Sequence, residues 1–197
     1  MRRGLIAALL TLALLAGLAF AGWKAYEYVY QRVTPKQCTV VMEGGTTVLS
    51  AEQARNAAVI VAVSAELGLP ERAAVIALAT AYQESDLRNL DYGDRDSLGL
   101  FQQRPSSGWG TVAELMDVRY SARAFFGGPE GPNGGSPRGL LDIKDWESMP
   151  LGDAAQRVQV SAFPDRYEAW VGAAEIISTT LGGGGECEPS GGNGQAA

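Results

Sequence analysis

The apolar residues between positions 50 and 181 recur mostly three or four residues apart, which is the spacing of one face of an α-helix. A capping-box pair, Ser50 and Gln53, precedes the first run and Gly68 follows it, so a helix is predicted from there to Leu67. The hydrophobic pattern therefore predicts a mainly α-helical domain.

The next predicted helix is strongly apolar. It begins near Pro70, whose fixed φ suits a first helical turn, and runs through AAVIALATAYQ to Glu84. The same signals predict shorter helices further along: a turn capped by Thr111 and Glu114, and helices over 117–126, 152–161 and 165–181.

Three segments break the helical pattern. Residues 39–49 alternate loosely around Glu43-Gly44-Gly45 and are interpreted as a short β-hairpin. Residues 127–139, GGPEGPNGGSPRG, are interpreted as a mobile loop, and the Gly-rich residues 182–197 as a disordered tail.

Residues 1–22 form a membrane-targeting segment. Two arginines precede 19 uncharged residues, close to the roughly 20 that cross a bilayer. A transmembrane signal anchor is favoured, because aromatic residues follow where an interfacial belt would lie, and the arginines then place the N-terminus in the cytoplasm. A cleaved signal peptide is the alternative, since Ala19-Phe20-Ala21 has the form of a processing site. Either way, the domain at 38–181 is expected outside the cytoplasm, after a juxtamembrane linker at 23–37.

The composition restricts the chemistry of this domain. The sequence has no histidine, which excludes Ser-His-Asp and Cys-His hydrolysis and His-ligated metal sites. Its 2 cysteines lie far apart, which excludes zinc clusters and CxxC redox motifs. The balance of 16 basic against 22 acidic residues argues against a nucleic-acid partner. Carboxylates remain as the acid–base groups, and no cofactor or metal is expected.

Glu84 is the leading candidate among these carboxylates. It ends an apolar helix and is soon followed by a glycine-punctuated polar loop, DYGDRDSLGLFQQRPS. An acid at such a boundary is partly desolvated, which raises its pKa and makes it suitable as the proton donor in glycoside cleavage. The alternative is that Glu84 only ends its helix at a solvated boundary.

Three motifs, in their order along the chain, resemble the lysozyme-like superfamily, especially bacterial lytic transglycosylases and goose-type lysozymes. They are Gln83-Glu84-Ser85, YGDRDSLGLFQ at 92–102 and LMDVRYSARAFF at 115–126. The resemblance covers residues 50–181 and implies a lysozyme-like fold that cleaves the glycan strands of peptidoglycan. It also implies that Glu84 is the catalytic acid and that residues 99–102 line the glycan cleft.

Two loop acids are candidates for a second catalytic carboxylate. Asp94 matches a goose-type Gly-Asp-Arg segment, Asp96 is a close rival, and Arg104 stands where that family has a later aspartate. If one of them positions a water molecule, the reaction is an inverting hydrolysis, which the Asp-rich loop favours. Otherwise Glu84 acts as acid and then base while the 6-hydroxyl of muramic acid attacks, as in the transglycosylases. A simple ion pair of Asp94 with Arg95 or Arg104 is the structural alternative.

Several further side chains are candidates for glycan binding. Gln102 is expected to bind a glycan acetamido group or, alternatively, to tie the loop to the backbone. Tyr92 and Phe101 are expected to stack on sugar faces, with a place in the core as the alternative. The Ala-Tyr-Asn motif of lytic transglycosylases is replaced by Ala-Phe-Pro, so its tyrosine hydroxyl is expected only if Tyr167 supplies it.

Cys38 and Cys187 flank the domain, 149 positions apart. Export permits a disulfide between them, and closing so long a loop is worth about 4 to 5 kcal/mol in the chain-entropy model. Two free thiols are the alternative. The sequence as a whole predicts an exported, membrane-anchored peptidoglycan-cleaving enzyme, and the main alternative is a catalytically silent glycan-binding or scaffold protein with the same fold.

Overall fold

The computed structural model of the chain divides into two compact units, residues 1–35 and 36–197. The expected membrane segment 1–22 lies outside the described residues, as do Cys187 and all of the predicted tail except its first residue, so the disulfide stays a prediction. In the part of the chain that the structure describes, no helix is long and apolar enough to cross a membrane. The described residues are 24, 38–42, 45–160 and 165–182.

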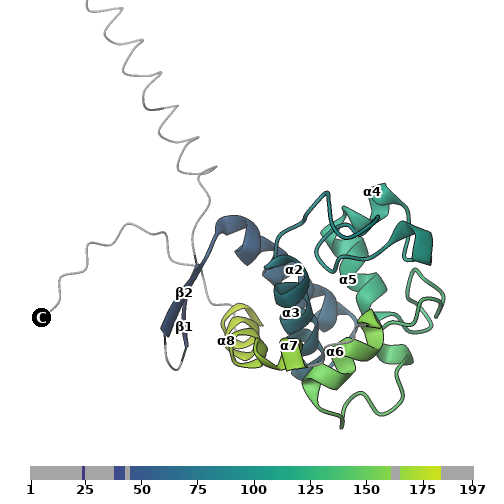
Figure 1. The fold of residues 1–197 in the computed structure, drawn as a ribbon. Coiled ribbons are helices and arrows are strands. Elements are labelled where there is room, and N and C mark those ends of the chain that lie inside the picture. Colours follow the sequence, from purple (N-terminus) through teal and green to yellow (C-terminus); the bar gives the residue numbers. More distant parts are fainter. Residues whose placement is uncertain (1–23, 25–37, 43–44, 161–164, 183–197) are drawn as a thin grey trace, which may run out of the picture. The chain divides into compact units, whose positions relative to one another are not determined.

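The second unit is mainly helical, as the hydrophobic pattern predicts (Figure 1). In chain order its elements are β1 (Cys38–Met42), β2 (Gly45–Leu49), α2 (Ala51–Glu66), α3 (Glu71–Ser85), the 3-10 turn η1 (Pro105–Ser107), α4 (Val112–Leu115), α5 (Val118–Phe126), the 3-10 turn η2 (Leu140–Asp142), α6 (Leu151–Gln159), α7 (Asp165–Glu168) and α8 (Val171–Gly182).

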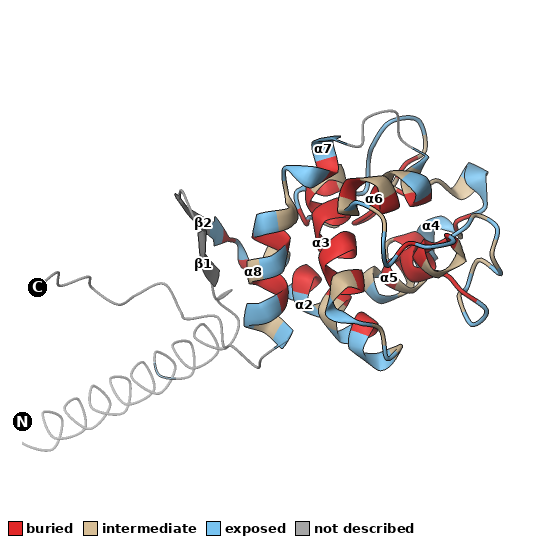
Figure 2. Cartoon of the chain, turned by 90° about the horizontal axis from the view of Figure 1, so that it is seen from below, coloured by how far each residue is buried: buried red, intermediate tan, exposed pale blue. Residues whose placement is uncertain are grey.

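Helix α3 is the centre of the hydrophobic core. Every residue from Ala73 to Tyr82 is buried, and α2, α5, α6, α7 and α8 all contact this helix. Figure 2 shows the buried stretch of α3 enclosed by its neighbours. The apolar sequence of α3 is therefore explained by burial on all sides, and the helix emerges from the core only near its ends.

The predicted hairpin and the first predicted helix are confirmed. Strand β1 pairs antiparallel with β2, with Cys38 opposite Leu49. The Ser50 hydroxyl accepts a hydrogen bond from the Gln53 backbone N–H at 3.2 Å, and Gln53 Oε1 accepts one from the Ser50 N–H at 2.8 Å. This reciprocal capping box satisfies two N–H groups that the start of α2 would otherwise leave unpaired.

The later capping residues also act as predicted. Thr111 and Glu114 form a second capping box at the start of α4. The Asp117 carboxylate caps α5 by accepting hydrogen bonds from the backbone N–H groups of Arg119 at 2.8 Å and Tyr120 at 3.2 Å. Short-range polar contacts thus define the start of each of these helices.

The prediction of one continuous helix over 165–181 is wrong. The structure has two helices, α7 and α8, with a turn at Trp170 between them. The Trp170 indole stacks on Tyr82 with ring centroids 4.3 Å apart, and its Nε1–H donates to Gln83 Oε1 at 2.9 Å. These contacts with α3 fix the turn, so long-range packing overrides the local helical pattern here.

The segment 127–139 contains no helix or strand, as predicted, but hydrogen bonds hold it at its base. The Asp142 carboxylate accepts the backbone N–H of Gly128 at 3.2 Å and that of Gly139 at 2.9 Å. Asn133 Nδ2 also donates to a backbone carbonyl of α5 at 3.3 Å. The loop is therefore closed on itself and attached to α5.

Candidate active site

Glu84 lies in the last turn of α3, where this helix emerges from the core. The side chain is half-buried, whereas the ten residues of α3 up to Tyr82 are buried. Burial raises the pKa of the Glu84 carboxyl group, because surroundings of low polarity disfavour the ionised form. A partly desolvated acid at the end of an apolar helix is what the sequence predicts.

The Glu84 carboxylate has a specific partner in Tyr167. The phenolic hydroxyl of Tyr167, on α7, donates a hydrogen bond to Glu84 Oε1 over 2.7 Å. This bond favours the ionised carboxylate and offsets part of the rise in pKa that burial causes. The Tyr167 side chain is only 2 % exposed, so packing holds the hydroxyl in place.

Tyr167 therefore supplies a tyrosine hydroxyl beside Glu84. The sequence predicted such a hydroxyl only on the condition that Tyr167 provided it. Residues 161–164, which include Phe163, lie outside the described residues. Direct contact of Tyr167 with a glycan stays a prediction. Its established contact is with the candidate acid.

Two further residues brace the end of α3, and neither was assigned a site role from the sequence. Trp170 donates a hydrogen bond from its indole N–H to Gln83 Oε1 at 2.9 Å and stacks on the buried ring of Tyr82, the residue before Gln83. Trp170 is on the predicted apolar stripe of the last helix, and Gln83 is next to Glu84 in the sequence motif. Their pairing depends on the turn between α7 and α8, which no local pattern indicates.

Ser85 connects the end of α3 to the loop that follows. Its hydroxyl is within hydrogen-bonding distance of the Leu100 carbonyl at 2.7 Å and of the Ala81 carbonyl at 3.1 Å. The next loop residue, Phe101, is 0 % exposed and stacks on Phe125 with ring centroids 4.6 Å apart. Phe101 thus has no ring face open to a sugar and belongs to the core, because it is buried against Phe125. Phe101 anchors the loop instead.

Gln102 ties the loop together. Its side-chain amide donates to the backbone carbonyls of Gly99 at 3.2 Å and Tyr92 at 3.3 Å. The amide oxygen packs so closely on Gly93 that a Cβ atom there would lie 1.9 Å from it. Of the two roles predicted for Gln102, the structure shows the second: its side chain ties the loop to the backbone. The Tyr92 ring is 63 % exposed and remains accessible.

Asp96 is bound within the loop rather than presented to a ligand. Its carboxylate accepts Arg104 Nε–H at 2.7 Å, the Ser106 backbone N–H at 2.8 Å and the Ser106 hydroxyl at 3.0 Å. Hydrogen bonds hold the pKa of Asp96 far below its usual range; the bond from Arg104 has the largest effect, and those from Ser106 add to it. A carboxylate with so low a proton affinity is a poor general base.

Asp94 has a different environment. Its side chain is 90 % exposed, and Oδ2 lies 3.9 Å from Arg95 Nε, an ion pair of little energetic value. In the described part of the chain, no hydrogen bond joins Asp94 or Asp96 to Glu84. The structure therefore brings Glu84 together with Tyr167 and leaves both loop acids with other partners.

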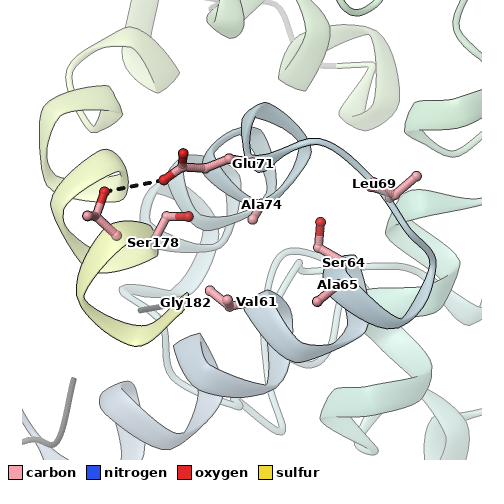
Figure 3. Close-up of a pocket in the computed structure, with 9 residues that line it drawn as sticks. Val61, Ser64, Ala65, Leu69, Glu71, Ala74, Ser178 and Gly182 are labelled. Carbon is pink, nitrogen blue, oxygen red and sulfur yellow. Dashed lines mark hydrogen bonds between the residues drawn. The ribbon is translucent and has the colours of Figure 1, made fainter. Parts of the chain in front are cut away.

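A separate pocket lies at the opposite end of α3 (Figure 3). It has a volume of about 370 Å³ and lies between α2, α3 and the end of α8. Glu71 at its edge is 13 positions before Glu84, which corresponds to about 20 Å along an α-helix. The Glu71 carboxylate accepts a hydrogen bond from the Thr179 hydroxyl at 3.2 Å. This pocket is distinct from the candidate active site.

Among the described residues, no group of three or more His, Cys, Asp and Glu side chains could hold a metal ion. No protein-family model matches the sequence, and no curated protein matches it. A functional conclusion for this chain therefore depends on its own residues and their geometry.

Proposed function

We propose that this chain cleaves the glycan strands of peptidoglycan, with Glu84 as the proton donor. The observation that carries the proposal is the pairing of Glu84 with Tyr167 at the end of an enclosed apolar helix. Burial favours the protonated acid that protonation of a leaving oxygen requires, and the Tyr167 hydroxyl fixes the direction of the carboxyl group.

The substrate class follows from the sequence motifs around this pair. Glu84 lies in a Gln-Glu-Ser motif that is followed, in the family order, by segments resembling those of lytic transglycosylases and goose-type lysozymes. The missing Ala-Tyr-Asn tyrosine is the main departure from that resemblance. A tyrosine hydroxyl reaches Glu84 all the same, from Tyr167. This supports an active site over a silent scaffold.

The environments of the loop acids favour a reaction in which Glu84 is both acid and base. Asp96 is held ionised by Arg104 and Ser106, and Asp94 is almost fully exposed and pairs with Arg95, so among the described contacts neither carboxylate is joined to Glu84. Hydrolysis, which the Asp-rich sequence of the loop favoured, requires such a base. We therefore favour attack by a hydroxyl group of the substrate itself.

The proposed reaction has two proton transfers. Glu84 donates its proton to the glycosidic oxygen as the bond from C1 of muramic acid to that oxygen breaks, which leaves Glu84 ionised. The Glu84 carboxylate then takes the proton of the muramic acid 6-hydroxyl as O6 bonds to C1. The products are a 1,6-anhydromuramic end and a new free hydroxyl on the leaving sugar, and Glu84 is protonated again. Tyr167 stabilises the ionised carboxylate between the two transfers.

We further propose that the domain acts outside the cytoplasm, anchored through residues 1–22 or released if that segment is cleaved. Peptidoglycan lies on that side of the membrane, so location and substrate agree. Edman sequencing of the exported protein separates the two forms: an N-terminus near Trp23 indicates cleavage, and an intact Met1 or Arg2 indicates an anchor.

The test of the proposed function is digestion of purified peptidoglycan by the full-length protein, with mass spectrometry of the products. Glycan fragments with 1,6-anhydromuramic ends are expected. Fragments with reducing ends would show hydrolysis and would return Asp94 to consideration as a base. Intact strands after prolonged incubation would contradict the enzymatic proposal and favour a binding or scaffold role.

A further inference from the structure

A second polar feature lies beside the loop that follows Glu84. It is a pocket of about 570 Å³ between three separate segments: the loop around Gln102, the C-terminal part of the 127–139 loop and the C-terminal end of α6. Each segment contributes one arginine to the lining, namely Arg104, Arg138 and Arg157. The other described lining residues are Gln102, Ser107, Trp109, Gly135, Ser136, Pro137, Val158, Gln159 and Val160.

Hydrogen bonds between neighbouring segments hold the walls of this arginine pocket in place. Gln159 Nε2 donates to the Phe101 carbonyl at 2.9 Å, which attaches the end of α6 to the loop. The base of the 127–139 loop is closed by Asp142. The three arginines therefore stand on restrained backbone, which lowers the entropy lost when a ligand binds.

The charges in the pocket are unbalanced. Arg104 is paired with Asp96 at 2.7 Å, whereas Arg138 and Arg157 are exposed and form no ion pair with any described carboxylate. No Asp or Glu is among the described lining residues. Two unpaired guanidinium groups thus share one concavity on a chain whose net charge is −6. Such a local excess of positive charge attracts an anion.

The arginine pocket adjoins the loop at residues 100–101. Ser85, the residue after Glu84, contacts the same stretch of loop. Ser85 bonds the Leu100 carbonyl at 2.7 Å, and the following residue, Phe101, accepts the Gln159 bond on the pocket side. Leu100 and Phe101 are buried, so this stretch of loop is a common support for the end of α3 and for the pocket.

We infer that this pocket binds a carboxylate group carried by the glycan substrate, through Arg138 and Arg157. This inference rests on the proposed function. The planar guanidinium fork matches carboxylate geometry, and both arginines have unused donors. Two substrate groups have this chemistry: the lactyl carboxylate of muramic acid without a peptide, and the carboxylates of the peptide stem.

The experiment measures binding rather than turnover, with the full-length Glu84→Gln protein so that no ligand is consumed. The probes are a neutral chitin oligosaccharide, peptide-free glycan strands and peptide-bearing glycan strands, each at low and high salt. Arg138→Gln and Arg157→Gln are each expected to weaken binding of a carboxylate-bearing probe by roughly tenfold. Binding of the neutral oligosaccharide is expected to stay unchanged. High salt should weaken only the charged probes.

Arg55→Gln is the matched control, since Arg55 is exposed on α2 and does not line the pocket. Melting temperatures of all variants check that they fold. Loss confined to peptide-bearing strands assigns the site to the stem, and loss confined to peptide-free strands assigns it to the lactyl group. Loss on both charged probes shows that the pocket takes either carboxylate; each of these results supports the inference. Equal loss on all three probes, or no loss on any, overturns it.

Failure of this inference and failure of the proposed function give different results. If wild-type protein cleaves peptidoglycan while the arginine variants bind every probe normally, the pocket is not a carboxylate site and the enzymatic proposal stands. If wild-type protein cleaves no strand while binding shows the expected charge dependence, the pocket stands and the enzymatic proposal falls.

Discussion

The Tyr167 hydroxyl donates a hydrogen bond to Glu84 Oε1 over 2.7 Å, although 83 positions separate the two residues in the sequence. Helix α3 brings Glu84 out of the core, and α7, which contacts α3, carries Tyr167 against it. Burial and this hydrogen bond act on the pKa of Glu84 in opposite directions, and burial has the larger effect. The pair therefore keeps Glu84 protonated more readily than an exposed glutamate while stabilising it once it has lost its proton.

Replacement of Tyr167 by phenylalanine tests this balance. Tyr167→Phe removes the one contribution that lowers the pKa of Glu84, so the alkaline limb of the pH–rate profile should move to higher pH. The maximal rate should fall by roughly tenfold or more, because the ionised carboxylate loses a charge-assisted hydrogen bond. Tyr120→Phe is the control, since the Tyr120 hydroxyl bonds the Trp109 carbonyl instead. An unshifted limb in Tyr167→Phe would contradict the role of this hydroxyl.

The stability of Glu84→Gln should depend on pH in a defined direction. The raised pKa means that the folded protein binds the Glu84 proton more tightly than the unfolded chain does. That contribution to folding is present below the unfolded pKa and is lost as the pH rises through the folded pKa. A neutral glutamine avoids the loss, so the variant should melt at or above the wild-type temperature at pH 7. The two should converge near pH 3. A variant that melts lower only at pH 7 contradicts the raised pKa.

Asp96 should matter for the loop rather than for proton transfer. Its low pKa reflects hydrogen bonds from Arg104 and Ser106, and this contribution to stability is present above the unfolded pKa and is lost as the pH falls. Asp96→Asn should therefore lower the melting temperature near pH 7, with a smaller difference in acid. The pH–rate profile should keep its shape. A lost limb in that profile would identify Asp96 as a catalytic group.

Trp170 should stabilise both the core and the end of α3. Trp170→Phe keeps a ring to stack on Tyr82 but removes the hydrogen bond to Gln83, at a cost of about 1 kcal/mol. Trp170→Ala removes both contacts and should cost roughly 3 kcal/mol. Urea denaturation gives both values. Equal costs for the two variants would show that the stacking contributes nothing.

Local features of the fold were predictable from the sequence because their causes are local. Ser50, Thr111 and Asp117 each cap a helix through backbone groups two or three positions away. The apolar run of α3 likewise indicated its burial. The break at Trp170 was not predictable, since it depends on a contact with Tyr82, which is 88 positions earlier.

The sequence singled out the candidate acid of the site, but it did not indicate the environments of the loop residues that follow it. Glu84 was singled out because an acid at the end of an apolar run is partly desolvated and because it lies in a Gln-Glu-Ser motif. Asp94 and Asp96 lie two positions apart in the same loop, and nothing in their sequence indicates that one is exposed and the other is bound to Arg104. The sequence likewise left two roles open for Phe101, contact with a sugar or a place in the core. Its packing on Phe125 shows that it belongs to the core.

The most direct test of the central proposal compares the products that wild type, Glu84→Gln and Asp94→Asn release from purified peptidoglycan. Mass spectrometry should find 1,6-anhydromuramic ends with wild type and Asp94→Asn at similar rates, and almost none with Glu84→Gln. The glutamine variant keeps the shape of the side chain, so its binding to the strands should persist. Wild-type turnover by Glu84→Gln would contradict the assignment of Glu84 as the proton donor.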